Sequence, residues 1–139
     1  MIYEKSCGAV VFRDAQTEDG KTQRYVLMIK HTKTSHHSFP KGHVESGETE
    51  HQTAQREVFE ETAVKIEIKS SFRHPVYYRP RPGVKKEVVY FRAFTEQQET
   101  YPAKGEVAVV EWIPIEKATC LLAHENDRCV LADALSHVD

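Results

Sequence analysis

Residues 42–64 read GHVESGETEHQTAQREVFEETAV and contain the clearest local signal of the chain. Thr49, followed three positions later by Gln52, forms a capping box, which is a common start of a helix. Neither Gly nor Pro interrupts the residues that follow, so the sequence predicts a helix over residues 50–62. The rest of the chain can be interpreted outward from this helix.

Three carboxylates crowd one face of the predicted helix. Glu57, Glu60 and Glu61 have the spacing i, i+3 and i+4, which places them on one adjacent face. A solvated helix face is the common explanation, but like charges four positions apart destabilise a helix by roughly a few tenths of a kcal/mol. A bound Mg²⁺ would turn that repulsion into a binding site, because hard cations take carboxylate oxygens as ligands.

The remaining segments predict one domain, residues 1–139, in which helices cover a β-sheet. Short apolar or alternating runs are typical of strands, and residues 115–138 have helical spacings. The polar stretch over residues 31–48 predicts a long loop, and loops of this kind are usually functional. The expected fold class is α+β. The predicted strands span residues 7–12, 25–30, 64–69, 71–78, 87–94 and 106–113.

Composition limits the classes of function. The net charge of -2 excludes a general polyanion-binding surface, so DNA is not an expected partner. No apolar run approaches the ~20 residues that span a bilayer, and the first residues lack the pattern of a signal peptide. The three cysteines have no paired spacing and are expected to be free thiols in a reducing compartment. We therefore expect a cytoplasmic protein without a membrane partner.

The carboxylate run belongs to a longer pattern. Gly42, Glu48, the run REVFEE over residues 56–61 and Val64 together resemble the signature of the Nudix hydrolases, at the same spacing. Ala63 stands where that signature has Gly. A residue just after a helix often adopts a left-handed conformation, which costs Ala roughly 1 kcal/mol. The resemblance implies a Nudix-type α/β/α sandwich with a mixed sheet and an enzyme that cleaves pyrophosphate linkages.

The same resemblance implies a site for Mg²⁺, with Mn²⁺ as a substitute. Glu57, Glu61 and Glu106 become the candidate catalytic residues, and the sequence leaves open whether Glu61 or Glu106 is the general base. Glu48 and Arg56 are implied to form an ion pair that supports the site without taking part in the chemistry. The implied metal ligands are four carboxylates and one backbone carbonyl: Glu57, Glu60, Glu61, Glu106 and Gly42.

The loop before the helix narrows the expected substrate. The run HHSFPKGHVESGE over residues 36–48 resembles the asymmetric diadenosine tetraphosphate hydrolases, a group of Nudix hydrolases. By that resemblance Tyr78 would stack on a base. Ser38 stands where the group has Trp, so any stacking there is lost or moves to a residue such as Phe39. The implied substrate-binding residues are Lys41, His43, Tyr78, Lys86 and Tyr90.

Several of these side chains have a purely structural alternative. A Tyr in a strand more often packs than binds a ligand. His36 and His37 point apart because they are adjacent, which makes a poor zinc pair. The four cations of residues 79–86 are either a solvated hairpin tip or a surface for the far end of a polyphosphate. Trp112 is expected to be a core residue.

Together these patterns predict a Mg²⁺-dependent pyrophosphohydrolase that acts as a monomer on a nucleotide polyphosphate. The expected substrate is a dinucleoside polyphosphate such as diadenosine tetraphosphate, in which water attacks one phosphorus and nucleotides are released. Enzymatic alternatives are removal of pyrophosphate from the 5′ end of RNA and hydrolysis of another nucleoside or inositol pyrophosphate. A Nudix-like sensor that binds a nucleotide without cleaving it is the alternative outside enzymes.

Overall fold

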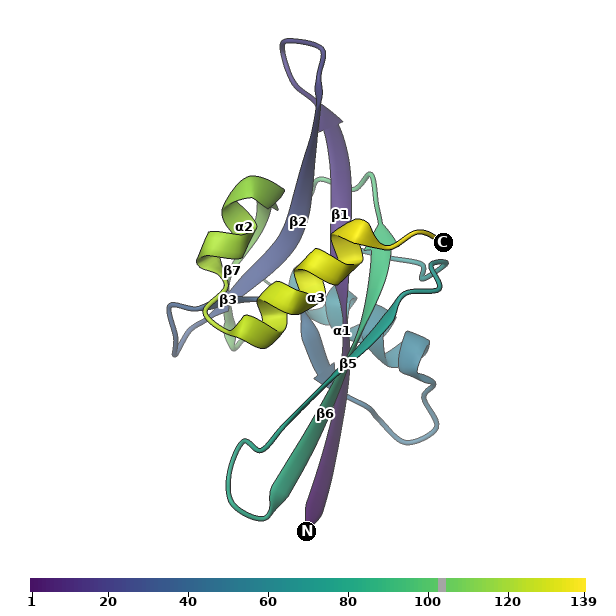
Figure 1. Ribbon diagram of the computed structural model, residues 1–139, viewed down its shortest axis with the longest axis vertical. Helices are drawn as coiled ribbons and strands as arrows, with labels where there is room; N and C mark the ends of the chain where they lie inside the picture. The colour runs from purple at the N-terminus through teal and green to yellow at the C-terminus, as the bar shows by residue number, and fades with distance from the viewer. Residues whose placement is uncertain (103–104) are drawn as a thin grey trace.

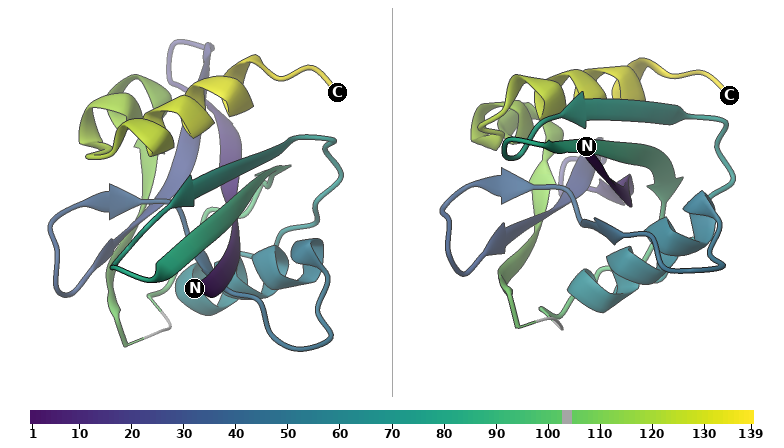
Figure 2. Two further views of the ribbon diagram at one scale, coloured as in Figure 1. Left: turned by 60° about the horizontal axis from the view of Figure 1, so that its bottom comes forward. Right: turned by 90° about the horizontal axis from the view of Figure 1, so that it is seen from below.

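A mixed β-sheet lies between helix α1 (Glu50–Thr62) on one face and helices α2 (Ile115–Leu121) and α3 (Glu125–Ser136) on the other (Figures 1 and 2). The computed structural model describes residues 1–102 and 105–139. This arrangement confirms the predicted α+β class and the α/β/α sandwich. Within the described part, the strands are β1 (Ile2–Gln16), β2 (Thr22–His31), β3 (His37–Ser38), β4 (Lys41–His43), β5 (Arg73–Tyr78), β6 (Val84–Phe94) and β7 (Val107–Pro114).

The long strand β1 organises the sheet. It pairs in parallel with β6, from Ile2 opposite Val84 to Phe12 opposite Phe94, and antiparallel with β2 and β4. β5 continues the sheet beside β6, and β7 pairs with β2. A parallel pair among antiparallel ones makes the sheet mixed. The pairing of β4 with β1 also places the segment before α1 against the middle of the sheet.

Both faces of β1 are buried, and successive side chains enter different cores. Val10 and Phe12 pack in the cluster that contains the apolar face of α3. Ala9 and Val11 point to the opposite face, where they pack with Val58 of α1. The two-residue period of a strand explains this division. The apolar run that predicted a strand at residues 7–12 is therefore the centre of the sandwich.

Helix α1 begins and ends where the sequence predicted. The Thr49 hydroxyl accepts a hydrogen bond from the Gln52 N–H at 3.1 Å, and the Gln52 side chain accepts one from the Thr49 N–H at 2.9 Å. After the last turn, Ala63 has φ 63° and donates its N–H to the Phe59 carbonyl at 2.8 Å. Ala63 thus adopts the left-handed conformation, which disfavours residues with a side chain.

The prediction of a strand over residues 64–69 is wrong. Buried and exposed side chains do alternate along this segment, but it pairs with no strand in the described part of the chain. Side-chain amides bind its backbone instead. Gln97 Oε1 accepts from the Lys65 N–H and Gln55 Oε1 from the Ile68 N–H, each at 3.1 Å. A period of two indicates an extended chain with one buried face, and only a partner strand makes it part of a sheet.

Two smaller expectations also change. The predicted long loop over residues 31–48 contributes β3 and β4 to the sheet. Trp112 lies at the edge of the core, half-buried, and its indole N–H donates to the Gln98 carbonyl at 3.0 Å.

The three cysteines are free, as predicted. Across residues 1–102 and 105–139, no helix has the length and apolar character needed to cross a membrane.

Candidate active site

The acidic face of α1 packs against strand β4, and this contact divides the three carboxylates. Glu57 and Glu61 are buried, with 4% and 5% of their surface exposed, whereas the Glu60 side chain is 37% exposed. The Lys41 N–H donates a hydrogen bond to Glu61 Oε1 at 2.8 Å. The three glutamates therefore share one region of the helix, but β4 covers only two of them.

Arg56 links the helix to the loop before it. Its guanidinium donates to Glu48 and to Glu57, in each case at 2.6 Å. It also reaches Glu60 at 3.0 Å and the His43 carbonyl at 2.9 Å. The predicted ion pair between Arg56 and Glu48 is thus present, and it holds the pKa of Glu48 down at about 2. Charge-assisted hydrogen bonds of this kind fix the positions of the carboxylates.

Gly42 permits the close approach of β4 to α1. A Cβ at this position would lie 1.8 Å from Glu57 Oε2 and 2.1 Å from the carboxyl carbon of Glu57. Any side chain at residue 42 would therefore displace a buried carboxylate, and glycine is the residue that fits. The structure brings together two members of the implied ligand set, Gly42 and Glu57.

The groups at this contact have the chemistry that a divalent cation prefers. Carboxylate and carbonyl oxygens are the usual ligands of Mg²⁺, and the missing side chain of Gly42 makes room for the Glu57 carboxylate. Among the described residues, however, no group of three acidic, His or Cys side chains is arranged to hold a metal ion. The donor set thus fits Mg²⁺ in kind, and the side chains would have to turn toward a common centre to bind it.

Glu106, the fourth implied carboxylate ligand, comes from another part of the chain. It is exposed in the turn before β7, and its carbonyl accepts a hydrogen bond from the Thr32 N–H at 2.8 Å. That bond ties the start of β7 to the residue after β2. Within the described residues, Glu106 is not gathered with the α1 carboxylates into a metal-binding group, so its role stays a prediction.

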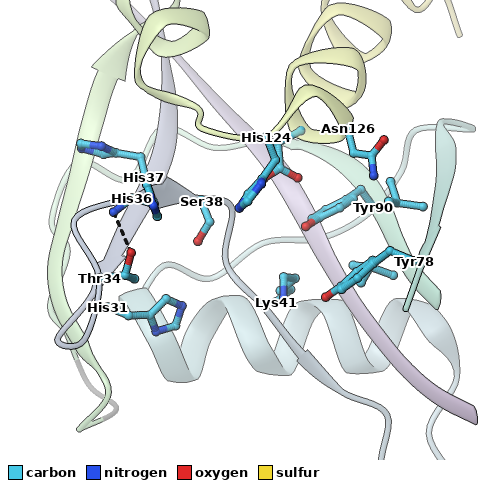
Figure 3. A pocket seen from close by; sticks show the side chains of 13 residues that line it. His31, Thr34, His36, His37, Ser38, Lys41, Tyr78, Tyr90, His124 and Asn126 are labelled. Atoms are coloured by element: carbon cyan, nitrogen blue, oxygen red, sulfur yellow. Dashed lines mark hydrogen bonds between the residues drawn. The ribbon is translucent and has the colours of Figure 1, made fainter. Parts of the chain in front are cut away.

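A pocket opens beside the carboxylates (Figure 3). Its volume is about 450 Å³, which suits a nucleoside or another small molecule. It lies between β5 and β6 on one side, the region around β3 on the other, and the first turn of α3. Mostly polar and aromatic side chains line it: His31, Thr34, His36, His37, Ser38, Lys41, Val76, Tyr78, Val88, Tyr90, His124, Asn126 and Asp127.

Three of the implied substrate-binding residues line this pocket. Tyr78 and Tyr90 project from β5 and β6 with their hydroxyl groups toward its interior (Figure 3). Lys41 lies on the side next to α1. Because the Lys41 N–H also binds Glu61, this residue borders both the pocket and the carboxylates.

The other two implied substrate-binding residues, His43 and Lys86, lie outside the lining. His43 ends β4 with an exposed side chain, and its carbonyl is bound by Arg56. Lys86 is half-buried on β6. Burial lowers its pKa, and the positive charge of Lys41 lowers it further, so the two cations lie close enough to interact. Lys86 therefore lies beside the pocket, near Lys41.

Several pocket residues were not singled out from the sequence, among them the polar residues His31, His124, Asn126 and Asp127. Polar residues at strand ends and in the first turn of a helix are common, and they usually serve as caps or face solvent. His36 and His37, for which a plain loop position was a sufficient explanation, also line the pocket. Only the packing of α3 over the sheet brings these segments together.

The pocket lies within electrostatic reach of the acidic face of α1. Burial raises the pKa of Tyr90 well above its ordinary value, and the nearby groups Asp127, Tyr78 and Glu61 raise it further. Burial also raises the pKa of Asp127, against the opposing effect of neighbouring cations. Tyr90 therefore interacts with an acid of α3 and with an acid of α1.

Known proteins resemble the chain over most of its length. The NUDIX domain model matches residues 4–134. An 8-oxo-(d)GTP phosphatase of Mycolicibacterium smegmatis is 32% identical over 131 residues, covering 91% of this chain and 40% of that protein. The asymmetrical bis(5′-nucleosyl)-tetraphosphatase of Mus musculus is 28% identical over 124 residues, covering 86% of this chain and 84% of that protein. The binary complex of a C. elegans Ap4A hydrolase has a TM-score of 0.78 at 26% identity and covers 93% of both chains.

The chain spans about half the length or less of the mycobacterial relatives that it matches, with coverages of 52% and 40%. The match to the family model, in contrast, extends over nearly the whole chain. The three-layer fold and the acidic helix agree with that match. The chain therefore belongs to the NUDIX family.

Proposed function

We propose that this protein hydrolyses a pyrophosphate linkage of a dinucleoside polyphosphate such as diadenosine tetraphosphate, with Mg²⁺ as its cofactor. The observation that carries the proposal is the position of Lys41. Its side chain lines the aromatic pocket, and its N–H binds Glu61. A nucleoside in the pocket would therefore extend its phosphates past Lys41 to the carboxylates of α1.

The cation would be held by Glu57, Glu60 and Glu61 with the Gly42 carbonyl, and it would supply charge neutralisation at the phosphate and a lowered pKa of water. Glu106 is a further candidate ligand. Arg56 would keep the carboxylates in place through the hydrogen bonds described above. This division of roles explains why an arginine lies in the middle of an acidic cluster.

The remaining residues would bind the substrate and transfer a proton. Tyr78 would stack on a base, while Lys41 and Lys86 would face phosphate oxygens. Glu61 or Glu106 would accept a proton from the attacking water. The water oxygen forms a bond to one phosphorus as the bridging P–O bond breaks, and the leaving nucleotide keeps the bridging oxygen.

The relatives support this substrate class. The mouse bis(5′-nucleosyl)-tetraphosphatase and the C. elegans Ap4A hydrolase each match more than four-fifths of this chain, and the match covers more than four-fifths of their own length. A second candidate is hydrolysis of an oxidised guanine nucleotide, because the 8-oxo-(d)GTP phosphatase has the higher identity of 32%. The chain covers only 40% of that protein, which weakens the transfer of its activity.

Product analysis in ¹⁸O-labelled water tests the proposal. The purified protein with Mg²⁺ is incubated separately with diadenosine tetraphosphate, 8-oxo-dGTP, a 5′-triphosphorylated RNA and an inositol pyrophosphate. We expect the dinucleotide to be the preferred substrate and to give ATP and AMP, with the label in only one of them. Absence of dinucleotide turnover, or much faster turnover of another compound, would contradict the proposal.

A chelator and one variant separate the enzyme from a nucleotide sensor. Removal of divalent cations by EDTA is expected to stop turnover, and added Mg²⁺ or Mn²⁺ to restore it. Glu60→Gln is expected to abolish turnover without unfolding the protein, because this side chain is partly exposed. A sensor would bind the nucleotide and show no turnover in wild type under any of these conditions.

A further inference from the structure

The hairpin that joins β5 to β6 begins at the tyrosine end of the pocket. Tyr78, which lines the pocket, is the last residue of β5. The hairpin lies beside the start of β1, at the lower end of the molecule in Figure 1. β1 pairs with β6 as far as Ile2 opposite Val84, and the Ile2 N–H donates to the Gly83 carbonyl at 2.8 Å. These strands therefore form a continuous surface from the pocket to the tip of the hairpin.

The structure divides the cations of this hairpin between two faces of the sheet. Lys86 lies opposite both Glu4 of β1 and Tyr78 of β5. Residues that lie opposite each other in neighbouring strands share a face, so Lys86 is on the face of the pocket. The adjacent Lys85 belongs to the other face, where its ammonium group lies 5.9 Å from the centroid of the Tyr77 ring. Only one of the two neighbouring lysines thus faces the path of a ligand that leaves the pocket.

Arg81 continues the pocket face beyond Lys86. Its guanidinium donates a hydrogen bond to Glu4 Oε1 at 2.8 Å, and this bond lowers the pKa of Glu4. Burial lowers the pKa of Lys86, and the positive charges of Lys41 and Arg81 lower it further. The three cations Lys41, Lys86 and Arg81 are therefore close enough to interact, and we call them the cation row.

The cation row suits a ligand with several negative charges. Glu4 supplies one negative charge against the three positive charges of the row, and like charges at short range repel each other. Lys86 is half-buried, and the Arg81 side chain is 58% exposed, so both are accessible to a ligand. A guanidinium can bind two phosphate oxygens at once, which makes Arg81 a suitable partner for a phosphate group.

The row also extends away from the pocket. Each residue of a strand adds about 3.3 Å, so the backbone of Lys86 lies roughly 13 Å along β6 from that of Tyr90. With a nucleoside in the pocket, the first phosphates would lie at Lys41. Lys86 and then Arg81 would be reached only by a longer phosphate chain.

We propose that Lys86 and Arg81 form a distal phosphate subsite, which makes binding tighter as the phosphate chain of the ligand becomes longer. A phosphate oxygen would replace Glu4 as the partner of Arg81. The proposal rests on the proposed function in taking the ligand to be a nucleoside polyphosphate with one end in the pocket. It adds the residues that set the preferred length of the phosphate chain.

Binding of substrate analogues tests the subsite without turnover. The analogues are diadenosine tri-, tetra- and pentaphosphates in which methylene groups replace the bridging oxygens between phosphorus atoms, so that these links resist hydrolysis. In saturating Mg²⁺, we expect wild type to bind the pentaphosphate analogue at least about fivefold more tightly than the triphosphate analogue, as one added surface ion pair provides. Affinity that does not rise with chain length would overturn the proposal.

Two variants of the hairpin assign the length dependence to the pocket face. Arg81→Gln is expected to bring the ratio of pentaphosphate to triphosphate affinity close to one, with little change for the triphosphate. Lys85→Gln removes the same charge from the other face and should leave the ratio unchanged. Equal effects of the two variants, or an equal loss for every analogue in Arg81→Gln, would contradict the subsite. Arg81 is exposed, so its loss should leave the fold intact, which circular dichroism checks.

A third variant should act in the opposite direction. Glu4→Gln removes the carboxylate that competes with phosphate for Arg81, and we expect it to tighten binding of the pentaphosphate analogue by about twofold or more. Weaker binding in Glu4→Gln would contradict the exchange of Glu4 for phosphate.

Turnover of natural diadenosine tetraphosphate is measured separately, so that the two proposals can fail independently. Cleavage of this dinucleotide together with affinities that do not depend on chain length would leave the proposed function and remove the subsite. A length dependence that disappears in Arg81→Gln, without cleavage of any dinucleotide, would remove the proposed function and leave the subsite. Failure of every analogue to bind would remove both.

Discussion

The acidic helix and the pocket lie side by side, but the chain builds them in different ways. Glu57, Glu60 and Glu61 come from two turns of one helix. The pocket takes its residues from the end of β2, the region around β3, β4, β5, β6 and the start of α3. The first region depends on local spacing, and the second on sheet pairing and the packing of a distant helix. Changes in the helix should therefore affect the chemical step, and changes in the pocket should affect the choice of ligand.

The largest expected effect is the loss of Glu61. Glu61→Gln removes a buried charge that the Lys41 N–H binds, and we expect kcat to fall by roughly 10² to 10⁴, the range for a lost general base. Steady-state kinetics at saturating Mg²⁺ measures the change. Glu67→Gln, at an exposed acid outside both regions, is the control and should leave kcat unchanged. Full activity of Glu61→Gln would remove this residue from the chemistry.

Loss of the Tyr78 ring should weaken substrate binding. Tyr78→Ala removes a stacking surface, and we expect KM to rise by a factor of roughly 5 to 150, from about 1–3 kcal/mol of stacking, with a small change in kcat. Tyr77→Ala is a matched control, because Tyr77 precedes it on β5, lies outside the pocket lining and binds Glu87 at 2.8 Å. Equal effects of the two variants would indicate a general role of β5.

Gly42→Ala tests the contact between β4 and α1. The new Cβ would lie 1.8 Å from Glu57 Oε2, so the carboxylate must move, and we expect a loss of about 1–3 kcal/mol in the free energy of unfolding together with lower activity. Chemical denaturation measures the stability. Gly105→Ala is the control, since a Cβ there meets no atom within 4 Å. A fully stable and active Gly42→Ala protein would show that this close approach is not needed.

Ala63→Gly should stabilise the end of α1. Ala63 has φ 63°, which glycine adopts without steric cost, so we expect a gain of up to about 1 kcal/mol and a Tm higher by roughly 2–4 °C. Thermal unfolding measures the shift. Activity should stay constant, because the residue lies outside the pocket lining. A lower Tm would mean that the conformation of residue 63 is set by something other than local strain.

The smallest effect concerns acid stability. Arg56 holds the pKa of Glu48 at about 2 in the folded protein, against an ordinary value of 4.5. This lowered pKa makes the ionised carboxylate stabilising above pH 4.5, and the contribution is lost as the pH falls through 4.5 toward about 2. The difference in unfolding free energy between wild type and Glu48→Gln should therefore shrink over that range. A difference that is constant with pH would show that charge is not its cause.

Much of the architecture followed from local patterns. The capping box at Thr49 and the spacing of the glutamates predicted α1 and its acidic face, because helical geometry depends on residues at most four positions apart. The apolar run at residues 7–12 predicted the central strand. Residues 64–69 also have a strand-like sequence pattern, but they form no strand. Strand pairing depends on a partner segment, which the sequence of these six residues does not specify.

Spacing within one short segment predicted the carboxylate helix and the left-handed position of Ala63, and the resemblance of that segment to the Nudix signature implied the family and the Arg56–Glu48 pair. Only the tertiary structure decided that β4 buries Glu57 and Glu61 and leaves Glu60 partly exposed. It also decided that Asp127 shares a pocket with Tyr78. These contacts join elements that are distant in the chain. The periodicity of the sequence does not predict them, because each contact depends on how the sheet and the helices pack.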